Sequence, residues 1–449
     1  MTQTSLPDLT AALLDLAKSA GAEAADALAV DGRSVSIDVR GGALEHAERA
    51  EGIEIGLRVL IDGRQACVSA SDTRHDTLAE MAERAVAMAR EAPRDPTLGL
   101  ADPAALATGW DAAALELSDP APEPDPAALE EDARRAEAAA LEVPGISKID
   151  TASAAYGARR LHLAATNGFS GGYSRTDRAL SCVAITGEGT GMERDYAGEV
   201  RIFQSDLPSP EEIGRLAAER TIARAGARQP GTGTYPVLFD ERVSGSLIGH
   251  LLAAINGSAI VRGSSWLRDA MDQPVLPDAL SLVEDPHRPR VGGSRPFDGE
   301  GLPTARRAIV EDGVLRGWTL DLSSARKLGL ASSANASRGV SSPPSPSAGN
   351  VTLTPGSHSR DDLVAQMGTG LLVTSMIGSS INPNTGDYSR GASGFWVENG
   401  EIAYPVNECT IAGNLRTMLR GIIPANDARQ YLGRVVPSLL VEGMTLAGK

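Results

Sequence analysis

Aromatic residues are scarce in this sequence. Phenylalanine, tryptophan and tyrosine together make up 4% of its 449 residues, while hydrophobic residues as a whole reach 42%. Any core must therefore be filled mainly by alanine, valine, leucine and isoleucine. The hydrophobic fraction is ordinary for a globular protein. A chain of this length is too long for one core, so we expect two or three domains.

Cysteine is also rare, and no long apolar run is present. The three cysteines, Cys67, Cys182 and Cys409, lie far apart in the chain. An odd, sparse set is typical of free thiols in a reducing compartment. No apolar run approaches the roughly 18 residues that span a bilayer, and the first 21 residues lack the basic start and apolar centre of a signal peptide. We therefore expect a cytoplasmic protein that does not contact a membrane.

Basic residues are fewer than acidic residues in this chain. The chain has 42 lysine and arginine residues against 58 aspartate and glutamate residues, a formal net charge of −16. Proteins that bind DNA or RNA gain affinity when basic side chains displace counterions from the phosphate backbone. An acidic chain is instead repelled by that backbone. The sequence therefore argues against a nucleic-acid partner.

Paired histidines are missing. Zinc peptidases usually place two histidines and a glutamate on one helical face, where the imidazoles bind the metal and the carboxylate takes a proton from bound water. Here no two histidines lie within a helical turn of each other. Only His250 falls on a predicted helix, and no acidic residue lies within a turn of it. The pattern favours a structural or surface histidine. The six histidines are His46, His75, His162, His250, His287 and His358.

The most informative stretch runs from Gly370 to Asn414. Leu371–Met376 is a short apolar run that predicts a buried strand. Asn382–Asp387 is dense in turn-forming residues and predicts an ordered loop. Asn399-Gly400 lies between two apolar runs and predicts a type I′ hairpin, because both central residues of that turn need positive φ. A polar loop is thus expected between a buried strand and a hairpin.

The N-terminal part predicts a compact α/β unit over residues 1–92. A helix is expected between Asp8, its candidate N-cap, and Gly21. Alternating apolar residues then predict strands, a hairpin turn and a second helix, over residues 33–39, 53–59, 62–63 and 76–91. Residues 93–125 are rich in proline, alanine and aspartate and predict a linker with at most a short turn.

The rest of the chain predicts two further domains. In the central domain, residues 126–228, a helix starts at Asp125-Pro126, an antiparallel meander covers residues 146–204, and a capping box at Ser209 opens another helix. The C-terminal domain, residues 232–449, begins with a strand and a helix over 241–255, in which Gly245 and Gly249 predict the close approach of another backbone. The whole predicts an α+β fold: an N-terminal α/β unit, a central antiparallel meander with helices, and a β-rich C-terminal domain with a few helices.

Three motifs suggest chemistry, each with a plainer interpretation. Residues 168–172 match G-x-S-x-G, but a nucleophile elbow needs a helix after the turn, and a strand is predicted after Ser170. Gly187–Gly191 resembles a phosphate loop without its lysine and with acidic Glu188, so a turn is favoured. Cys409 has no histidine near it in sequence, so a buried inert thiol is favoured, although spatial neighbours remain open.

The polar loop is the remaining candidate site. Its side chains could hydrogen-bond an extended peptide backbone or line a subunit interface. The alternative is a turn that satisfies its own hydrogen bonds, and the residues alone leave both open. The candidates for a peptide channel or interface are Asn382, Asn384, Asp387, Tyr388 and Arg390.

The order of motifs in this chain resembles the TldD/PmbA family, within it the PmbA (TldE) branch. NPNTGDYS, GFWVENGEIAYPV and TIAGNL follow one another near the C-terminus, and RGSSWL, RPFDGEG and PSLLVEG also match, at residues 262–267, 295–301 and 437–443. The resemblance covers most of the chain. It implies a role in a heterodimeric bacterial metalloprotease that trims or degrades peptides.

The resemblance also implies where zinc would be bound. In the TldD branch, the helix after the equivalent strand carries an HExxxH motif, and a cysteine near the C-terminus is a further ligand. Here that helix reads SGSLIGHLLAAING, in which His250 does not match the motif, and residues 437–449 contain no cysteine. We therefore assign no catalytic or metal-binding residue to this chain and no cofactor of its own. Zinc is expected in a TldD-type partner subunit.

These observations lead to one functional hypothesis and two alternatives. The first is a non-metal subunit that pairs with a zinc-bearing TldD-type subunit and helps form a peptide-binding chamber, with a possible homodimer when it is alone. The second is a stand-alone, metal-independent hydrolase that uses Cys409 or a serine. The third is a peptide-binding adaptor without a role in cleavage.

Overall fold

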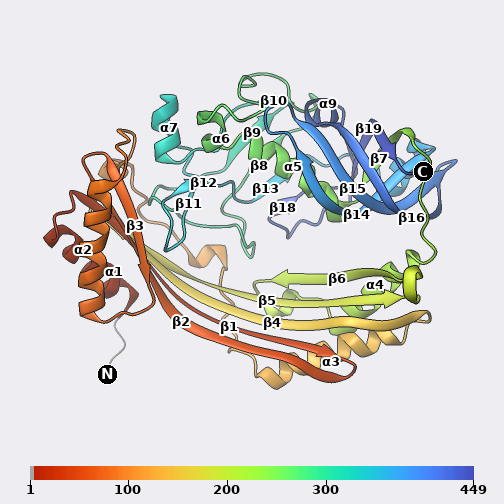
Figure 1. Ribbon diagram of the computed structural model, residues 1–449, viewed down its shortest axis with the longest axis horizontal. Helices are drawn as coiled ribbons and strands as arrows, with labels where there is room; N and C mark the ends of the chain where they lie inside the picture. Colours follow the sequence, from red (N-terminus) through yellow and green to blue (C-terminus); the bar gives the residue numbers. More distant parts are fainter. Residues whose placement is uncertain (1–4) are drawn as a thin grey trace.

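The computed structural model describes residues 5–449 and has two layers (Figure 1). The lower layer is a long antiparallel sheet with strand order β3-β2-β1-β4-β5-β6. Register pairs such as Asp26↔Ala165 join β1 to β4, so the strands of the first 70 residues and those of residues 146–201 form one continuous sheet. The strands are β1 Ala24–Arg40, β2 Ala43–Ile61, β3 Arg64–Ala70, β4 Ile146–Ala165, β5 Ser170–Thr186 and β6 Glu193–Arg201.

Turns with positive φ connect these strands where the sequence predicts them. Asp62 and Gly63 have φ of 48° and 66° in the β2–β3 hairpin. Gly168, between β4 and β5, has φ of 99°. The Gly187–Gly191 segment is a turn ahead of β6, as predicted, with Gly187 at φ 75°. Left-handed conformations carry little steric penalty at glycine, which explains the three glycines, and aspartate also tolerates this conformation, as at Asp62.

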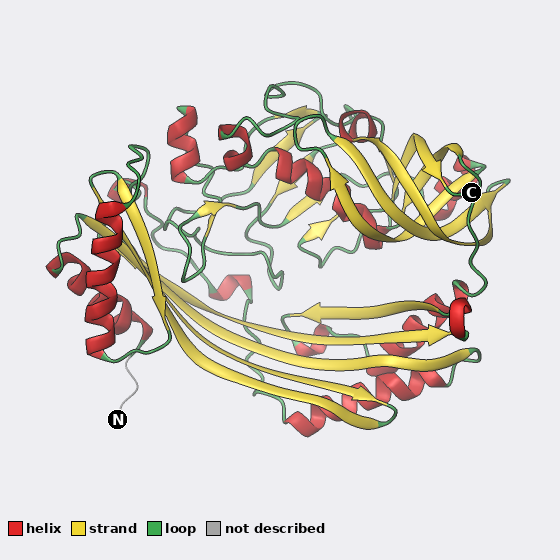
Figure 2. Ribbon diagram, in the orientation of Figure 1, coloured by secondary structure: helices red, strands yellow, loops and turns green. Residues whose placement is uncertain are grey.

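Helices cover the outer face of the sheet in two groups (Figure 2). The N-cap of the first helix is Ser5, whose Oγ accepts a hydrogen bond from the Asp8 backbone N–H. The predicted cap at Asp8 is therefore wrong. The helix begins three residues earlier than its apolar periodicity shows. Ser209 and Glu212 form the predicted capping box. The helices are α1 Leu6–Ser19 and α2 His75–Glu91 at one end, and α3 Pro126–Leu141 and α4 Pro210–Ala223 at the other.

Small residues let these helices pack closely. The core under α3 and α4 contains many alanines, and the core under α1 and α2 combines alanine with leucine. At Gly214 a Cβ atom would lie 2.1 Å from the carbonyl oxygen of Ala136, so α3 and α4 approach each other at a point that only glycine allows. The low aromatic content predicted cores of this kind.

Residues 93–125 contain only short turns, as predicted, but they are packed against the rest of the protein. Leu115 and Leu117 are buried. The Trp110 ring lies 5.8 Å from Phe169 of the sheet layer and 5.1 Å from Phe297 of the upper layer, measured between ring centroids. The segment therefore follows the surface of both layers. The short turns are η1 Pro103–Ala105 and η2 Ala113–Leu115.

The upper layer is formed by residues from 233 onward and is built around a second sheet, with strand order β16-β15-β14-β7-β19-β17. An additional β16–β19 pairing closes five of these strands into a small barrel. The β15–β16 hairpin turns at Asn399 and Gly400, with φ of 54° and 78°, as predicted. The strands are β7 Gly233–Phe239, β14 Gly370–Ile381, β15 Asp387–Glu398, β16 Glu401–Asn414, β17 Ile423–Pro424 and β19 Leu439–Ala447.

Shorter elements complete the upper layer. A five-stranded sheet has the order β10-β9-β8-β13-β18, and β11 pairs with β12. The α+β prediction is confirmed. The strands are β8 Leu282–Glu284, β9 Arg307–Glu311, β10 Val314–Leu315, β11 Ala336–Ser337, β12 Ser345–Pro346, β13 Val351–Leu353 and β18 Arg434–Val435; the helices are α5 Glu241–Ala254, α6 Gly257–Val261, α7 Leu322–Leu328, α8 Arg360–Met367 and α9 Leu415–Arg420.

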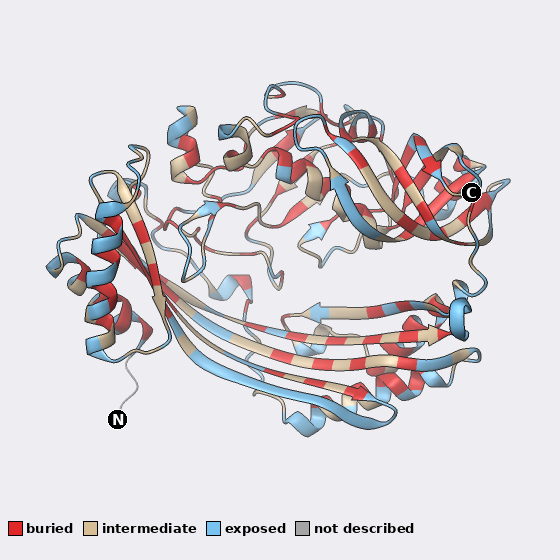
Figure 3. Cartoon of the chain, viewed as in Figure 1, coloured by how far each residue is buried: buried red, intermediate tan, exposed pale blue. Residues whose placement is uncertain are grey.

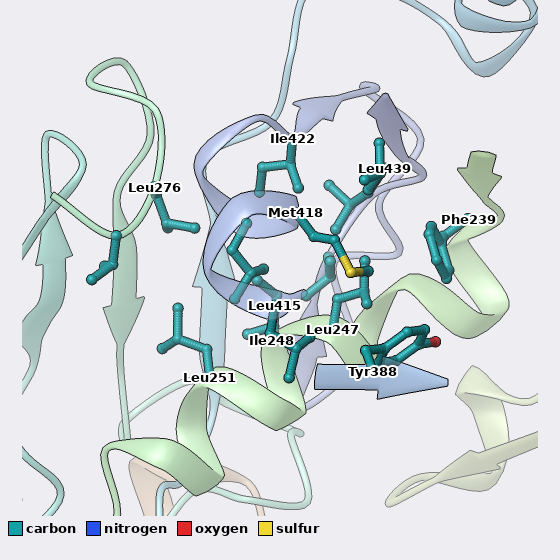
Figure 4. Packing of buried hydrophobic residues seen from close by; sticks show 14 of the residues in the cluster. Phe239, Leu247, Ile248, Leu251, Leu276, Tyr388, Leu415, Met418, Ile422 and Leu439 are labelled. Carbon is teal, nitrogen blue, oxygen red and sulfur yellow. The ribbon is translucent and has the colours of Figure 1, made fainter. Parts of the chain in front are cut away.

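Helix α5 packs against the barrel through one stripe. Leu247, Ile248 and Leu251 are fully buried and contribute to the large core in Figure 4. The predicted backbone approach at the two glycines is wrong: nothing lies within 4 Å of a Cβ built on Gly245, and only the Arg434 guanidinium lies near Gly249. Both glycines lie off the buried stripe, which sequence spacing alone did not reveal.

Charged and aromatic contacts join the two layers. Asp26 of β1 accepts hydrogen bonds from Arg58 of β2 and from Arg338, which follows β11 in the upper layer. At the other end, Arg242 of α5 lies 3.2 Å from Asp195 of β6. The alternating buried and exposed bands along the sheet are visible in Figure 3. Among residues 5–449, no helix is long and apolar enough to cross a membrane.

Candidate functional site

The loop before β15 satisfies most of its own hydrogen bonds. Asn382 Oδ1 accepts from the backbone N–H groups of Asn384 and Thr385, at 3.0 and 3.3 Å. Asp387 accepts from the Thr385 hydroxyl at 2.6 Å and from Asn414 Nδ2 at 3.0 Å, and these bonds lower the pKa of the Asp387 carboxyl. Asn382 and Asp387 thus hold the turn together, while Asn384 is exposed at its tip.

Tyr388 and Arg390 extend from β15 just after this loop. Tyr388 is 2% exposed, and its hydroxyl donates to Met376 Sδ at 3.4 Å. Burial raises the pKa of the Tyr388 phenol to about 12. Arg390 is half-buried, and its Nε donates to the carbonyl oxygen of Gly378 at 2.7 Å. Both side chains therefore contact β14, the strand that pairs with β15.

Helix α5 places His250 beside Tyr388. The His250 ring meets the Tyr388 ring edge to face, with centroids 5.8 Å apart, and Tyr388 lies beside α5 in Figure 4. His250 Nε2 is buried and has no hydrogen-bond partner among the described residues. Burial lowers the pKa of His250, and the charges of Arg390 and Arg434 lower it further. Tyr388, Arg390 and His250, separate in sequence, are thus neighbours in space.

The residues around His250 do not fit a metal ion. Zinc needs three or four convergent nitrogen, sulfur or oxygen ligands. The charged groups acting on His250 are two guanidinium groups, Arg390 and Arg434, which repel a divalent cation. Over residues 5–449, no group of three or more histidine, cysteine, aspartate or glutamate side chains is placed to hold one.

Ser170 has a histidine partner that the sequence pattern did not reveal. Its Oγ lies 3.2 Å from His162 Nε2, and His162 Nδ1 lies 2.8 Å from the Thr10 hydroxyl. The predicted strand after Ser170 is confirmed, since β5 follows directly, so no nucleophile elbow forms. The β4–β5 register, which pairs His162 with Gly172, brings the two side chains together. Only strand pairing carries that information.

The cysteines are thiols. All three are free. Cys409 is buried, its Sγ donates to the carbonyl oxygen of Ala392, and burial raises the pKa of the thiol to about 11. A thiol with that pKa is not ionised at neutral pH and is a poor nucleophile. The predicted burial of Cys409 is confirmed, and that the thiol is inert stays a prediction.

A cavity of about 610 Å³ lies between the two layers. It is lined by apolar side chains and by arginines from both layers. Arg175 of β5 donates hydrogen bonds to the carbonyl oxygens of Gly292 and Ser294 across the gap. The lining includes Leu161, Leu163, Phe297, Arg159, Arg175 and Arg295.

Comparison with known proteins identifies the family. Three domain models of the PmbA/TldA metallopeptidases match: domain 1 over residues 25–89, the central domain over 119–225 and the C-terminal domain over 232–448. The Escherichia coli O157:H7 metalloprotease PmbA is 38% identical over 450 residues, covering 99% of this chain and 96% of that protein. The PmbA homologue of Haemophilus influenzae is 35% identical over 97% of this chain and 94% of its own length.

Solved structures have the same fold as this chain. A crystal structure from Bacteroides thetaiotaomicron, described there as a candidate modulator of DNA gyrase, has a TM-score of 0.92 at 28% identity and covers 100% of both chains. TldE from Thermococcus kodakarensis has the same fold, with a TM-score of 0.84 at 19% identity over 98% of this chain and 100% of that chain. From its matched domains and its full-length relatives, this chain belongs to the PmbA branch of the TldD/PmbA metallopeptidase family.

Proposed function

We propose that this chain is the subunit without zinc in a heterodimeric TldD/PmbA-type peptidase. It pairs with a zinc-bearing TldD-type subunit in the cytoplasm, helps enclose a peptide-binding chamber, and is needed for peptide cleavage without supplying a metal ligand. The observation that carries the proposal is the surroundings of His250, where Arg390 and Arg434 stand instead of metal-binding side chains. The three free thiols are consistent with a reducing compartment.

The polar loop supports a place at the chamber or the subunit interface. Asn384 is exposed, and Tyr388 and Arg390 adjoin the cluster around His250. Asn382 and Asp387 would act indirectly, by fixing the turn that carries Asn384. In this proposal the loop contacts peptide or partner, and the interface is of the large, obligate kind that often exceeds about 2,000 Å². A chain without its partner would form a homodimer through the same surface.

The decisive experiment compares the chain alone with the reconstituted pair. We expect the purified chain to retain no stoichiometric zinc after dialysis and to cleave no peptide. Mixed with a TldD-type subunit, it should form a stable complex whose cleavage of unfolded peptides is abolished by a chelator. Stoichiometric zinc in the chain alone, or chelator-sensitive cleavage without the partner, would contradict the proposal. Peptide binding combined with no effect on a partner's activity would favour the adaptor instead.

Two loop variants distinguish a loop that contacts peptide or partner from a loop that only stabilises the fold. Asn384→Ala should lower the activity of the assembled complex without changing its melting temperature, because the side chain is exposed. Asp387→Ala should lower both, because it also removes the acceptors of Thr385 and Asn414. If Asn384→Ala leaves activity and assembly unchanged, the loop is only a structural turn.

A metal-independent hydrolase is a second candidate, favoured by the Ser170 contacts. The Thr10 hydroxyl donates to the carbonyl oxygen of Pro7 at 3.0 Å, so it accepts from His162 Nδ1–H. His162 Nε2 then carries a lone pair that accepts the Ser170 Oγ–H. Burial lowers the pKa of His162, which keeps the ring neutral at pH 7 and able to act as a base. Ser170 is exposed to solvent.

A labelling experiment tests this candidate. If Ser170 is a nucleophile, a fluorophosphonate probe should label the folded chain, and Ser170→Ala should abolish both labelling and hydrolysis of p-nitrophenyl acetate. The matched control is Ser19→Ala, which removes an exposed hydroxyl from the end of α1. Equal labelling of the two variants would show that the Ser170–His162 contact only anchors α1 to the sheet.

A further inference from the structure

A cluster of basic groups without acidic partners lies beside α5. The chain carries a net charge of −16, and arginines close to this helix are paired: Arg242 with Asp195 at 3.2 Å, and Arg429 with Glu241 at 2.8 Å. Arg390 and Arg434 differ from them. Within residues 5–449, neither forms an ion pair; Arg390 donates a hydrogen bond to a backbone carbonyl and faces the Tyr388 hydroxyl, whose pKa its charge lowers.

The backbone anchors the Arg390 guanidinium, and the exposed Arg434 guanidinium lies in the open space beside α5. Arg390 is anchored through Nε to the carbonyl oxygen of Gly378, and no acidic side chain among residues 5–449 pairs with its guanidinium group. Arg434, at the start of β18, lies against α5 where Gly249 has no side chain: a Cβ there would be 2.9 Å from Arg434 Nη1. The missing side chain at residue 249 is thus the space that the second guanidinium occupies.

The charges of both arginines act on His250. Its pKa is lowered by burial and then by Arg390 and Arg434, and no carboxylate raises it. His250 Nε2 is buried and unpartnered among the described residues. The Tyr388 ring packs against the imidazole and fixes one side of the cluster. Three nitrogen-bearing side chains therefore lie in one region beside α5, where no carboxylate is among the groups that act on His250.

We propose that Arg390, Arg434 and His250 form a binding site for a carboxylate group of the peptide substrate. Planar guanidinium groups bind carboxylates through paired hydrogen bonds, and two such groups bind one carboxylate firmly. The net negative charge of the chain weakens its general attraction for an acidic peptide, so binding of a carboxylate requires a local group of basic side chains such as this one. The carboxylate comes from the peptide's C-terminus or from an aspartate or glutamate side chain. This proposal rests on the proposed function for the peptide nature of the ligand.

The site would let this subunit orient a peptide without a metal. Anchoring one carboxylate fixes the direction in which an extended chain leaves the cluster. It also selects peptides that carry an acidic group at a set distance from the bond that the partner subunit cleaves. The specificity of the complex would therefore reside partly in the chain that does not perform the chemistry.

Glycine variants on α5 provide a matched test. Gly249→Ala should displace the Arg434 guanidinium, whereas Gly245→Ala meets nothing within 4 Å. Both changes favour the helix to a similar degree, because alanine has a higher helix propensity than glycine. We expect both variants to be at least as stable as the wild type in thermal unfolding, and only Gly249→Ala to lose affinity for acidic peptides.

The binding assay uses three fluorescent, N-acetylated alanine-rich heptapeptides on the full chain. One has a free C-terminal carboxylate, one has a C-terminal amide, and one has the amide together with an internal glutamate. We expect one or both carboxylate peptides to bind at least tenfold more tightly than the neutral amide, with an affinity that falls as salt rises. Comparing the two carboxylate peptides identifies the source of the group.

Charge variants complete the test. Arg390→Gln and Arg434→Gln should each weaken carboxylate binding by about tenfold to a hundredfold, since a charged hydrogen bond is removed. Arg215→Gln, an equal change of charge at an exposed position on α4, should have no effect. Equal binding of the acidic and neutral peptides, or unchanged binding in both cluster variants, would overturn the proposal.

The outcome is separable from that of the proposed function. Carboxylate binding that depends on the arginines supports the site even if no TldD-type partner is activated. Partner-dependent cleavage without any preference for carboxylates overturns the site and leaves the proposed function standing.

Discussion

Replacing Asp26 with asparagine should destabilise the contact between the two layers. The Asp26 carboxylate is 3% exposed and lies between two arginines. Its Oδ2 accepts from Arg58 Nε at 2.7 Å and from Arg58 Nη2 at 2.5 Å, and its Oδ1 accepts from Arg338 Nη1. The side chains of both arginines are nearly inaccessible, with 4% exposure for Arg58 and 2% for Arg338. Asparagine keeps the volume but removes the negative charge that contacts both arginines.

The magnitude follows from burial. Removing one partner of a buried ion pair costs about 3–5 kcal/mol, because the remaining charge is left unpaired away from water. Asp31 provides the control: it pairs with Arg160, whose side chain is 65% exposed, and exposed pairs contribute about 0–1 kcal/mol. Asp26→Asn should therefore lower the free energy of unfolding by several times as much as Asp31→Asn.

Two measurements check this prediction. Chemical denaturation gives the loss of stability for both variants, and limited trypsin digestion probes the interface, because Arg338 lies in the loop after β11 and is a trypsin target when it is exposed. We expect Asp26→Asn to show new cleavage after Arg338 before the barrel unfolds. Equal stability of the two variants, with Arg338 still protected, would refute the reasoning that this buried triad joins the layers.

Three further predictions follow from buried groups. Burial, assisted by a neighbouring carboxylate, raises the pKa of Glu300 to about 8. The folded state therefore holds a proton that the unfolded state has lost, and stability should fall as the pH rises from about 4.5 to 8. Glu300→Gln should match the wild type near pH 4.5 and be more stable by roughly 2–4 kcal/mol at pH 9 in denaturation curves. Gly214→Ala should destabilise the packing of α3 on α4, because the new Cβ meets the Ala136 carbonyl oxygen at 2.1 Å; an unchanged melting temperature would contradict this. Cys409 should resist alkylation in the folded chain and react once it unfolds, as mass spectrometry of labelled peptides would show, and rapid native labelling would contradict its buried, protonated state.

Local sequence determined the turns, two of the three predicted helix caps and most of the elements. Asp62-Gly63 and Asn399-Gly400 form the predicted hairpins, since the φ values they adopt are open to few other residue pairs. Ser209 forms its predicted capping box, because the donor and acceptor are three residues apart. The absence of paired histidines was likewise visible in the sequence. Such features depend on neighbours along the chain, so a single sequence is enough to predict them.

Pairing between distant strands was decided only by the tertiary structure. Nothing in the periodicity of residues 24–40 or 146–165 shows that β1 and β4 lie side by side. That register places His162 beside Ser170, a partner that the sequence motif lacked. The spaced apolar side chains of residues 93–125, Trp110 among them, were hidden by a composition typical of a linker, and their packing depends on residues far away in the chain.

The same division holds for the candidate site. The sequence by itself singled out Tyr388 and Arg390 in a polar loop and His250 on a helix, but as unrelated features. The structure brings them together and adds Arg434, which had no sequence signal, because its role depends on the empty space at Gly249. Charge balance at one point in space is a sum over side chains from several elements, and only their folded positions decide it.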